Sequence, residues 1–205
     1  AADTMPSAPQ HVGRKARFLM AANRTEEALE PLYRTVVRLA RLGEYARARH
    51  LLTVRQELMQ SLPIGPRSPE ALGSAVAAIM VAERDGRYAV LQQDGPAHIA
   101  WARECSDWEA VALLHLEYGN SFYALGQVEA CTREMLLGLS VARQQRLPWV
   151  SAILTRMCFL AIRTGALDEA ASRAREAVYA AEVTGDLLAV GTAYGMLSRV
   201  AWQRG

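Results

Sequence analysis

Five glycines recur along the chain at a nearly constant interval. They are Gly43, Gly86, Gly126, Gly165 and Gly205, separated by 43, 40, 39 and 40 residues. Each closes a run of apolar residues with helical spacing, and the first four precede another such run. A period near forty is typical of stacked repeats, in which one unit can bury its apolar face only against its neighbours. The spacing therefore predicts an array of helical hairpins.

Apolar residues also recur at fixed distances from these glycines. Offsets of four, eight and eleven residues before a glycine fall on one face of a helix. The residues four before are Leu39, Ala82, Phe122, Ala161 and Ala201, and those two after the first four glycines are Tyr45, Tyr88, Val128 and Leu167. Each repeat is thus predicted to be helix, tight turn, helix, with glycine in the left-handed conformation that other residues enter at a cost. In this register Leu39 and Phe122 are expected to be buried.

Prolines complicate two of the predicted helices. Pro31 is tolerated only near a helix start, so the first helix begins either near Thr25 or near Glu30. Pro96, which follows Asp94 and Gly95, is expected to interrupt and kink the second helix of the second repeat. Residues 61–69 contain three prolines and a glycine and are predicted to be a loop. The other helices are expected at 44–60, 107–124, 128–145, 148–163, 167–183 and 186–203.

The predicted architecture is all-α, a right-handed solenoid of about four and a half antiparallel hairpins. Residues 1–24 are interpreted as an N-terminal tail with a leading helix, and residues 25–205 as the repeat domain. The last helix, 186–203, lacks a second helix, which indicates a fragment of a longer array. Tyr194, Leu197 and Ala201 should border the resulting open face, through which the chain is expected to self-associate.

Three segments carry a family resemblance. LARLGEYARARHLL (39–52), YALGQVEACTREML (123–136) and IRTGALDEAASRAREAV (162–178) resemble tetratricopeptide-type repeats. The forty-residue version resembles the helical arrays of large bacterial regulators, such as LuxR-type activators of the maltose-regulator class and SARP-type regulators. The usual tryptophan and closing proline of tetratricopeptide units are not repeated, so a HEAT-like or other α-solenoid is the alternative. The resemblance implies a scaffold for protein interaction, signal transduction or transcription regulation. A cytoplasmic location is expected because the sequence shows neither a membrane span nor a signal peptide.

Sequence motifs of catalysis and cofactor binding are missing. The sequence has no phosphate-binding loop, no His-Glu-x-x-His and no nucleophile elbow. Cys105, Cys131 and Cys158 lack metal-ligand spacing, and His115 falls in a core-facing position. A net charge of +2 with interspersed acids argues against direct nucleic-acid binding. We therefore expect no enzyme activity, no cofactor and no metal site, and the longest uncharged helical stretch is too short to cross a membrane.

Function is expected on the surface of the repeats. In tetratricopeptide-like stacks the first helices line the groove, which points to residues two, three and six before each glycine. The chosen candidates are Arg41, Met80, Arg84, Asn120, Tyr123, Phe159, Arg163, Arg199 and Trp202. Arginines beside aromatic rings suit acidic, aromatic-bearing peptides or an amphiphilic effector. The partner is thus a protein or peptide, a domain of the same parent chain, or a small effector, and a free-standing adaptor is the alternative to a regulator's sensor region.

Overall fold

A computed structural model describes residues 18–19, 24–84 and 86–205, without the side chains of Arg84 and Val90. Within these residues all regular secondary structure is helical, and the chain divides into two compact units, with the boundary in the sequence between Cys105 and Ser106. The first unit contains α2 (Glu26–Arg41), α3 (Tyr45–Gln60), α4 (Pro69–Arg84) and α5 (Tyr88–Glu104). The second contains α6 (Trp108–Ala124), α7 (Val128–Gln144), α8 (Val150–Arg163), α9 (Leu167–Thr184) and α10 (Leu187–Arg204).

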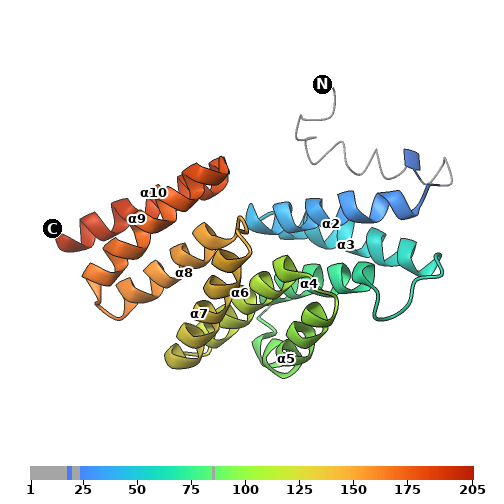
Figure 1. The fold of residues 1–205 in the computed structure, drawn as a ribbon, viewed down its shortest axis with the longest axis horizontal. Helices are drawn as coiled ribbons and strands as arrows, with labels where there is room; N and C mark the ends of the chain where they lie inside the picture. The colour runs from blue at the N-terminus through green and yellow to red at the C-terminus, as the bar shows by residue number, and fades with distance from the viewer. Residues whose placement is uncertain (1–17, 20–23, 85) are drawn as a thin grey trace. The chain divides into compact units, whose positions relative to one another are not determined.

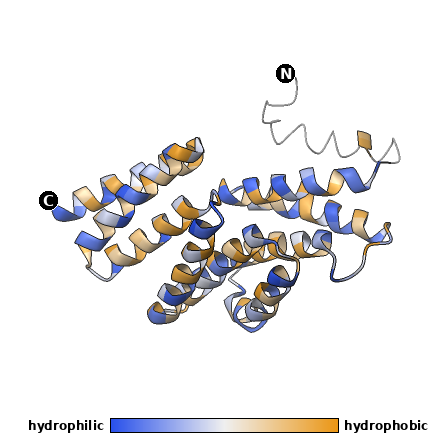
Figure 2. Cartoon of the chain, viewed as in Figure 1, coloured by the Kyte–Doolittle hydropathy of each residue, from blue (hydrophilic) through white to orange (hydrophobic). Residues whose placement is uncertain are grey.

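Consecutive helices pair as hairpins inside each unit (Figure 1). In the first unit α2 packs on α3 and α4 on α5, and in the second α6 packs on α7 and α8 on α9, with α10 against both α8 and α9. Each helix carries hydrophobic and hydrophilic residues around its circumference (Figure 2). The predicted all-α hairpin repeat is confirmed, and the predicted helix boundaries agree to within about two residues. The leading helix expected within residues 1–24 lies largely outside the described residues.

Side-chain caps begin three of these helices. The Asp107 carboxylate accepts a hydrogen bond from the Ala110 amide (2.9 Å), and the Asp186 carboxylate accepts bonds from the amides of Leu188 and Ala189 (3.1 Å each). The Ser68 hydroxyl accepts from the Ala71 amide at 3.1 Å, just before Pro69 opens α4. Such caps satisfy amides that have no partner inside the helix.

The glycine turns have the predicted conformation. The φ angles of Gly43, Gly86, Gly126 and Gly165 lie between +72° and +80°. A side chain at this φ is strained whatever space surrounds it, because its Cβ approaches the neighbouring backbone. The period of forty residues is thus the period of left-handed turns inside hairpins.

A second series of left-handed residues, which we did not predict, connects one hairpin to the next. Ser106, Arg146 and Gly185 have φ of 55°, 53° and 66°, and follow α5, α7 and α9. Their spacing is also close to forty residues. Only Gly185 has the residue type that marks such a conformation in a sequence, so the series is hidden at the other two positions.

Replacing Arg146 with glycine should therefore stabilise the second unit. Arg146→Gly relieves a left-handed cost but adds backbone freedom to the unfolded chain, so we expect a net gain of about 0.5–1 kcal/mol. Urea denaturation followed by far-ultraviolet circular dichroism measures the change. Gln145→Gly, one residue earlier at φ −93°, is the control and should not stabilise. Equal effects of both changes would contradict the conformational explanation.

Both prolines lie inside helices, which corrects one prediction and decides an open one. The α5 helix continues through Pro96 without interruption, and the first helix begins at Glu26 with Pro31 inside it. A proline disfavours helical geometry in the preceding residue through contact with its Cβ. Gly95 has no Cβ, which removes this contact and lets the helix continue. Near Pro31, the Thr35 hydroxyl donates to the proline's carbonyl oxygen at 2.8 Å.

The first unit is held together by a buried arginine. The Arg55 guanidinium, on α3, donates to the Leu29 carbonyl of α2 at 3.1 Å, to the Glu70 carbonyl of α4 at 2.8 Å and to the Ser74 hydroxyl. The residue is 2% exposed. Burial lowers the pKa of this guanidinium, while the carboxylates of Glu30 and Glu70 and the Tyr33 side chain act in the opposite direction. One cation thus joins three helices through neutral oxygens.

Loss of this guanidinium should destabilise the first unit strongly. Arg55→Ala leaves buried acceptors without a donor and opens a cavity, for which we expect a loss of about 2–4 kcal/mol. Arg47→Ala, which removes an exposed ion pair to Glu44, should cost less than about 1 kcal/mol. Urea denaturation of both variants checks the difference. Similar losses would show that the Arg55 network contributes little.

Loop 61–68 is fixed to α5 by its last residues. The Trp101 indole donates to the Arg67 carbonyl at 3.2 Å, and the Arg67 guanidinium lies 2.7 Å from a Glu104 oxygen and 5.9 Å from the Trp101 ring centroid. Residues 61–68 form only turns and irregular structure, which confirms the predicted loop except at Pro69, where α4 begins. The tertiary contacts explain how a proline-rich connection keeps α4 in place.

In the second unit α6 and α7 approach closely through two glycines. A Cβ at Gly119 would lie 2.8 Å from the Met135 side chain, and one at Gly138 would lie 3.0 Å from the His115 side chain.

Leu39 in the first unit is 1% exposed, as predicted. Phe122, however, is only partly buried, because it lies near the end of α6. Its ring packs at a tilt against Tyr118, with ring centroids 4.7 Å apart.

None of the helices built from the described residues is both long and apolar enough to span a membrane.

Candidate functional site

The candidate residues are divided between the two units. In the first unit Arg41 is exposed, Met80 is buried with 5% of its surface exposed, and the Arg84 side chain is outside the described structure. Met80 therefore cannot offer the groove contact we predicted unless the helices move. The Phe and Tyr candidates and the remaining arginines lie in the second unit, and the site is built from that unit alone.

Three candidates of the second unit form a continuous row, which we call the aromatic–arginine row: Tyr123, Phe159 and Arg199. The Tyr123 and Phe159 rings meet edge to face, with centroids 5.6 Å apart. The Arg199 guanidinium carbon lies 5.1 Å from the Phe159 centroid. The row joins α6, α8 and α10, the three first helices of the unit.

The repeat explains why these residues meet. Phe159 and Arg199 both lie six residues before a turn glycine, and α8 and α10 pack side by side. Equal offsets place side chains at equal heights on neighbouring first helices. Tyr123, three residues before its glycine, lies one turn nearer the hairpin.

Asn120, the α6 residue six before its glycine, behaves differently. It is 5% exposed, and its side-chain amide donates to a Glu117 carboxylate oxygen at 3.2 Å. Within the described residues the Asn120 amide oxygen has no hydrogen-bond partner. The sequence placed Asn120 in the groove wall, whereas the structure places it beneath the surface, where the smaller side chain is covered.

Arg163 and Trp202 flank the row on the same helix faces. Arg163 lies four residues after Phe159 and Trp202 three after Arg199, spacings that keep side chains on one face of a helix. Both are exposed, Trp202 with 78% of its surface accessible. No contact joins either side chain to the row among the interactions of the described residues.

The row combines forked cationic donors with aromatic faces. Arg199 is exposed beyond the Phe159 ring, and Tyr123 and Phe159 are partly buried. A guanidinium held on a ring can still donate to a carboxylate, and the rings offer flat apolar contact. The arrangement suits an acidic side chain next to an aromatic or aliphatic one.

A buried polar pair is the other concentration of chemistry in this unit. His115 Nδ1 lies 2.8 Å from a Glu134 oxygen, joining α6 to α7, and the two residues are 3% and 8% exposed. Burial and the Glu134 carboxylate raise the pKa of the adjacent Tyr118, while Arg133 lowers it. The expectation of a packed histidine agrees with this burial. No sequence pattern indicated Glu134 as the partner of His115, since it lies nineteen residues away on the next helix.

Breaking this pair should cost more than removing it. Glu134→Ala leaves the imidazole facing an apolar cavity, and we expect a loss of about 3 kcal/mol in unfolding free energy. A His115→Leu, Glu134→Leu double variant replaces both polar groups. Its loss of unfolding free energy should be smaller than the sum of the losses of the two single leucine variants. A double-mutant cycle by urea denaturation provides the measurement. Additive losses would mean that the two side chains do not interact.

The three cysteines divide by burial. Cys131 and Cys158 are 1% and 0% exposed, and burial raises the pKa of each thiol to about 11. Cys105 is partly exposed. The two buried thiols occupy core positions of α7 and α8, and no disulfide joins any of the three.

Thiol labelling should reproduce this division. At pH 8 a thiol with a pKa near 11 is about 0.1% thiolate, and burial also excludes reagent, so Cys131 and Cys158 should stay unlabelled in the folded chain. Cys105 should react, and all three should react in urea. Mass spectrometry of the labelled peptides identifies the sites. Rapid labelling of Cys158 in the folded chain would contradict its placement in the core.

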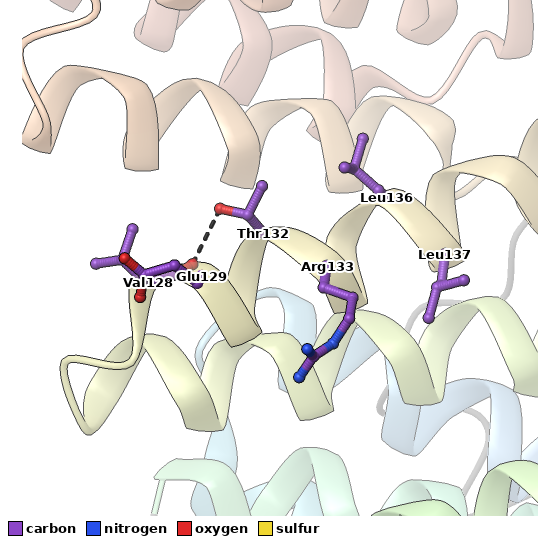
Figure 3. A pocket seen from close by; sticks show the side chains of 6 residues that line it. All are labelled: Val128, Glu129, Thr132, Arg133, Leu136 and Leu137. Carbon is purple, nitrogen blue, oxygen red and sulfur yellow. Dashed lines mark hydrogen bonds between the residues drawn. The ribbon is translucent and has the colours of Figure 1, made fainter.

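A hollow of about 520 Å³ lies on α7 (Figure 3). Every side chain that lines it belongs to this one helix, and the apolar members Leu136 and Leu137 are 47% and 43% exposed. The Thr132 hydroxyl is engaged with the Val128 carbonyl at 2.9 Å. Glu129 and Arg133 are the charged groups of the hollow. The residues do not converge on an enclosed space, so we do not assign the site here.

Among the described residues no group of three or more histidine, cysteine, aspartate or glutamate side chains is placed to hold a metal ion. Trp149 is 6% exposed and its indole donates to a Glu109 oxygen at 3.0 Å, whereas Trp108 is 38% exposed.

Comparisons with known proteins identify similar folds but no related sequence family. A scan against protein-family models finds no match, and a search of curated proteins finds no similar sequence. Among solved structures, a Rap protein complexed with Competence and Sporulation Factor matches with a TM-score of 0.64 and 9% identity, over 94% of this chain and 62% of that one. BtubC (BKLC) from P. vanneervenii matches with a TM-score of 0.53 and 14% identity, over 96% of this chain and 86% of that one.

This chain thus spans less than two thirds of the Rap protein's length. At these identities the likenesses show the fold, which is a tetratricopeptide-like helical repeat.

Proposed function

We propose that this chain is a non-catalytic binding scaffold whose second unit holds a protein or peptide segment across α6, α8 and α10. The observation that carries the proposal is the aromatic–arginine row, in which Tyr123, Phe159 and Arg199 from three helices lie in contact. Aromatic side chains and arginine are the residues that most often dominate binding energy at protein interfaces. A row along successive repeats suits an extended ligand.

The chemistry of the row indicates the class of ligand. The exposed guanidinium groups of Arg199 and Arg163 favour carboxylates in the ligand. The rings of Tyr123 and Phe159 favour aromatic or branched side chains. An acidic peptide with an aromatic residue satisfies both. The Rap structure, which contains Competence and Sporulation Factor, lends support by analogy of fold alone.

The wider setting we propose is a bacterial multidomain regulator in the cytoplasm, with these repeats as its sensor or partner-binding region. The repeat segments quoted above support this setting. A free-standing adaptor would use the same row, and a small amphiphilic effector would occupy part of it. A catalytic role has less support, because the buried His115–Glu134 pair is enclosed by helices and does not face an open cleft.

Selection from a phage-displayed peptide library tests the proposal. We expect enrichment of peptides that combine Asp or Glu with Phe, Tyr or Trp. A fluorescein-labelled enriched peptide should bind the full chain with an affinity that falls as salt is added, because an exposed ion pair is screened. Arg199→Ala should weaken binding by about tenfold, equivalent to about 1.4 kcal/mol.

Matched variants locate the binding surface. Phe159→Ala and Arg163→Ala should also weaken binding, whereas Arg175→Ala, which removes an exposed arginine of α9, should leave it unchanged. Circular dichroism establishes that each variant is folded. Peptides that bind the Arg199→Ala and Phe159→Ala variants as tightly as the unaltered chain would place the site elsewhere.

A further inference from the structure

One side of α10 is apolar and exposed. We call it the α10 face and define it by residues at helical spacing: Leu187, Gly191, Tyr194, Ser198, Ala201 and Trp202. Leu187, Tyr194 and Trp202 are 84%, 47% and 78% exposed. The opposite side of the helix carries the buried residues that pack on α8 and α9, among them Ala193 and Val200.

The same repeat positions are buried on α8. Cys158 and Ala161 stand at the offsets of Ser198 and Ala201, seven and four residues before the turn glycine, and are 0% and 5% exposed. They pack against the alanines of α9 that begin the second helix of that hairpin. The α10 face is therefore the surface on which this fold receives another helix.

Two glycines on α10 have no explanation within their own chain. A Cβ added at Gly191 or at Gly195 would meet nothing within 4 Å. A glycine inside a helix costs about 0.5–1 kcal/mol relative to alanine. Gly119 and Gly138, by contrast, make room for side chains of a neighbouring helix. Gly191 and Gly195 would serve the same purpose if a helix from outside the chain approached α10 closely.

Charge along α10 favours an antiparallel neighbour of the same kind. Asp186 caps the start of the helix and Glu182 lies just before it, in the last turn of α9, whereas Arg199 and Arg204 lie near its end. No basic residue occurs between Glu176 and Ser198. Two parallel copies would bring like charges together. Two antiparallel copies place the acidic end of one beside the basic end of the other, which is electrostatically favourable.

We infer that the α10 face binds a second copy of this chain, with the two α10 helices antiparallel about a twofold axis near residues 194 and 195. In this register Leu187 of one copy faces Trp202 of the other, and Gly191 faces Ser198. Tyr194 covers Gly195 across the axis. Large side chains thus meet at the two ends, and at the centre each Tyr194 lies over a glycine of the other copy, so the face is complementary to itself.

Sedimentation equilibrium of the full chain tests the association. We expect a reversible dimer, and Gly191→Gln should raise its dissociation constant by at least about tenfold by blocking the close approach. The same change should raise the melting temperature of a dilute sample, because glutamine favours a helix more than glycine does. Thr192→Gln, on the next residue and off the α10 face, should leave the dissociation constant unchanged.

Two outcomes would overturn the inference. One is a chain that stays monomeric up to about 1 mM, a concentration at which even weak specific pairing is populated. The other is a dimer that Gly191→Gln does not weaken, since its interface would then lie elsewhere. A Gly191→Gln variant with a higher melting temperature and a weaker dimer is the result expected if Gly191 serves a contact with another chain.

Cross-linking tests the orientation. Gly191→Cys and Ser198→Cys are made in separate chains with Cys105→Ser, mixed and oxidised. The antiparallel pair predicts disulfides between the two variants, while each variant alone stays uncross-linked. Seven residues of helix would separate identical positions by about 10 Å, beyond the Cα separation of about 7 Å that a disulfide spans. Cross-linking of each variant with itself would contradict the antiparallel arrangement.

Discussion

Burial of each helix by its neighbours is the constraint on which this structure depends. The helices are amphipathic and of sixteen or so residues, and helices of this length are marginal in water without tertiary packing. Tight turns with a left-handed residue return the chain so that the next helix covers the last one. In the second unit, alternation of the Gly126 and Gly165 turns with the Arg146 and Gly185 turns therefore determines the height at which side chains of successive helices lie.

The aromatic–arginine row is a consequence of that regularity. Because successive first helices are related by the repeat, residues at one offset from the turn become neighbours in space although forty residues separate them. Phe159 and Arg199 meet for this reason. The row needs no loop or insertion, and substitutions at one offset alter its chemistry without disturbing the packing offsets four and eleven residues before each glycine.

Polar groups in the cores break the regularity and give each unit its own character. Arg55 joins three helices of the first unit through carbonyl and hydroxyl oxygens, and His115 with Glu134 joins α6 to α7 in the second. Such groups tolerate few alternative partners, since an unpaired buried polar atom is costly. They favour one register of helix packing over others that purely apolar offsets would permit.

The sequence by itself determined the helical hairpins, their boundaries and the glycine turns, because helical periodicity and left-handed glycine are local properties. It also included Tyr123, Phe159 and Arg199 among its nine candidate residues, without indicating that these three lie in contact. Tertiary structure alone decided that Met80 and Asn120 are buried, that Phe122 is half-covered and that α5 continues through Pro96. It likewise supplied the acceptors of Arg55 and the Glu134 partner of His115. These features depend on the distance and angle between helices, which side-chain volumes across the whole interface determine and a periodic pattern does not encode.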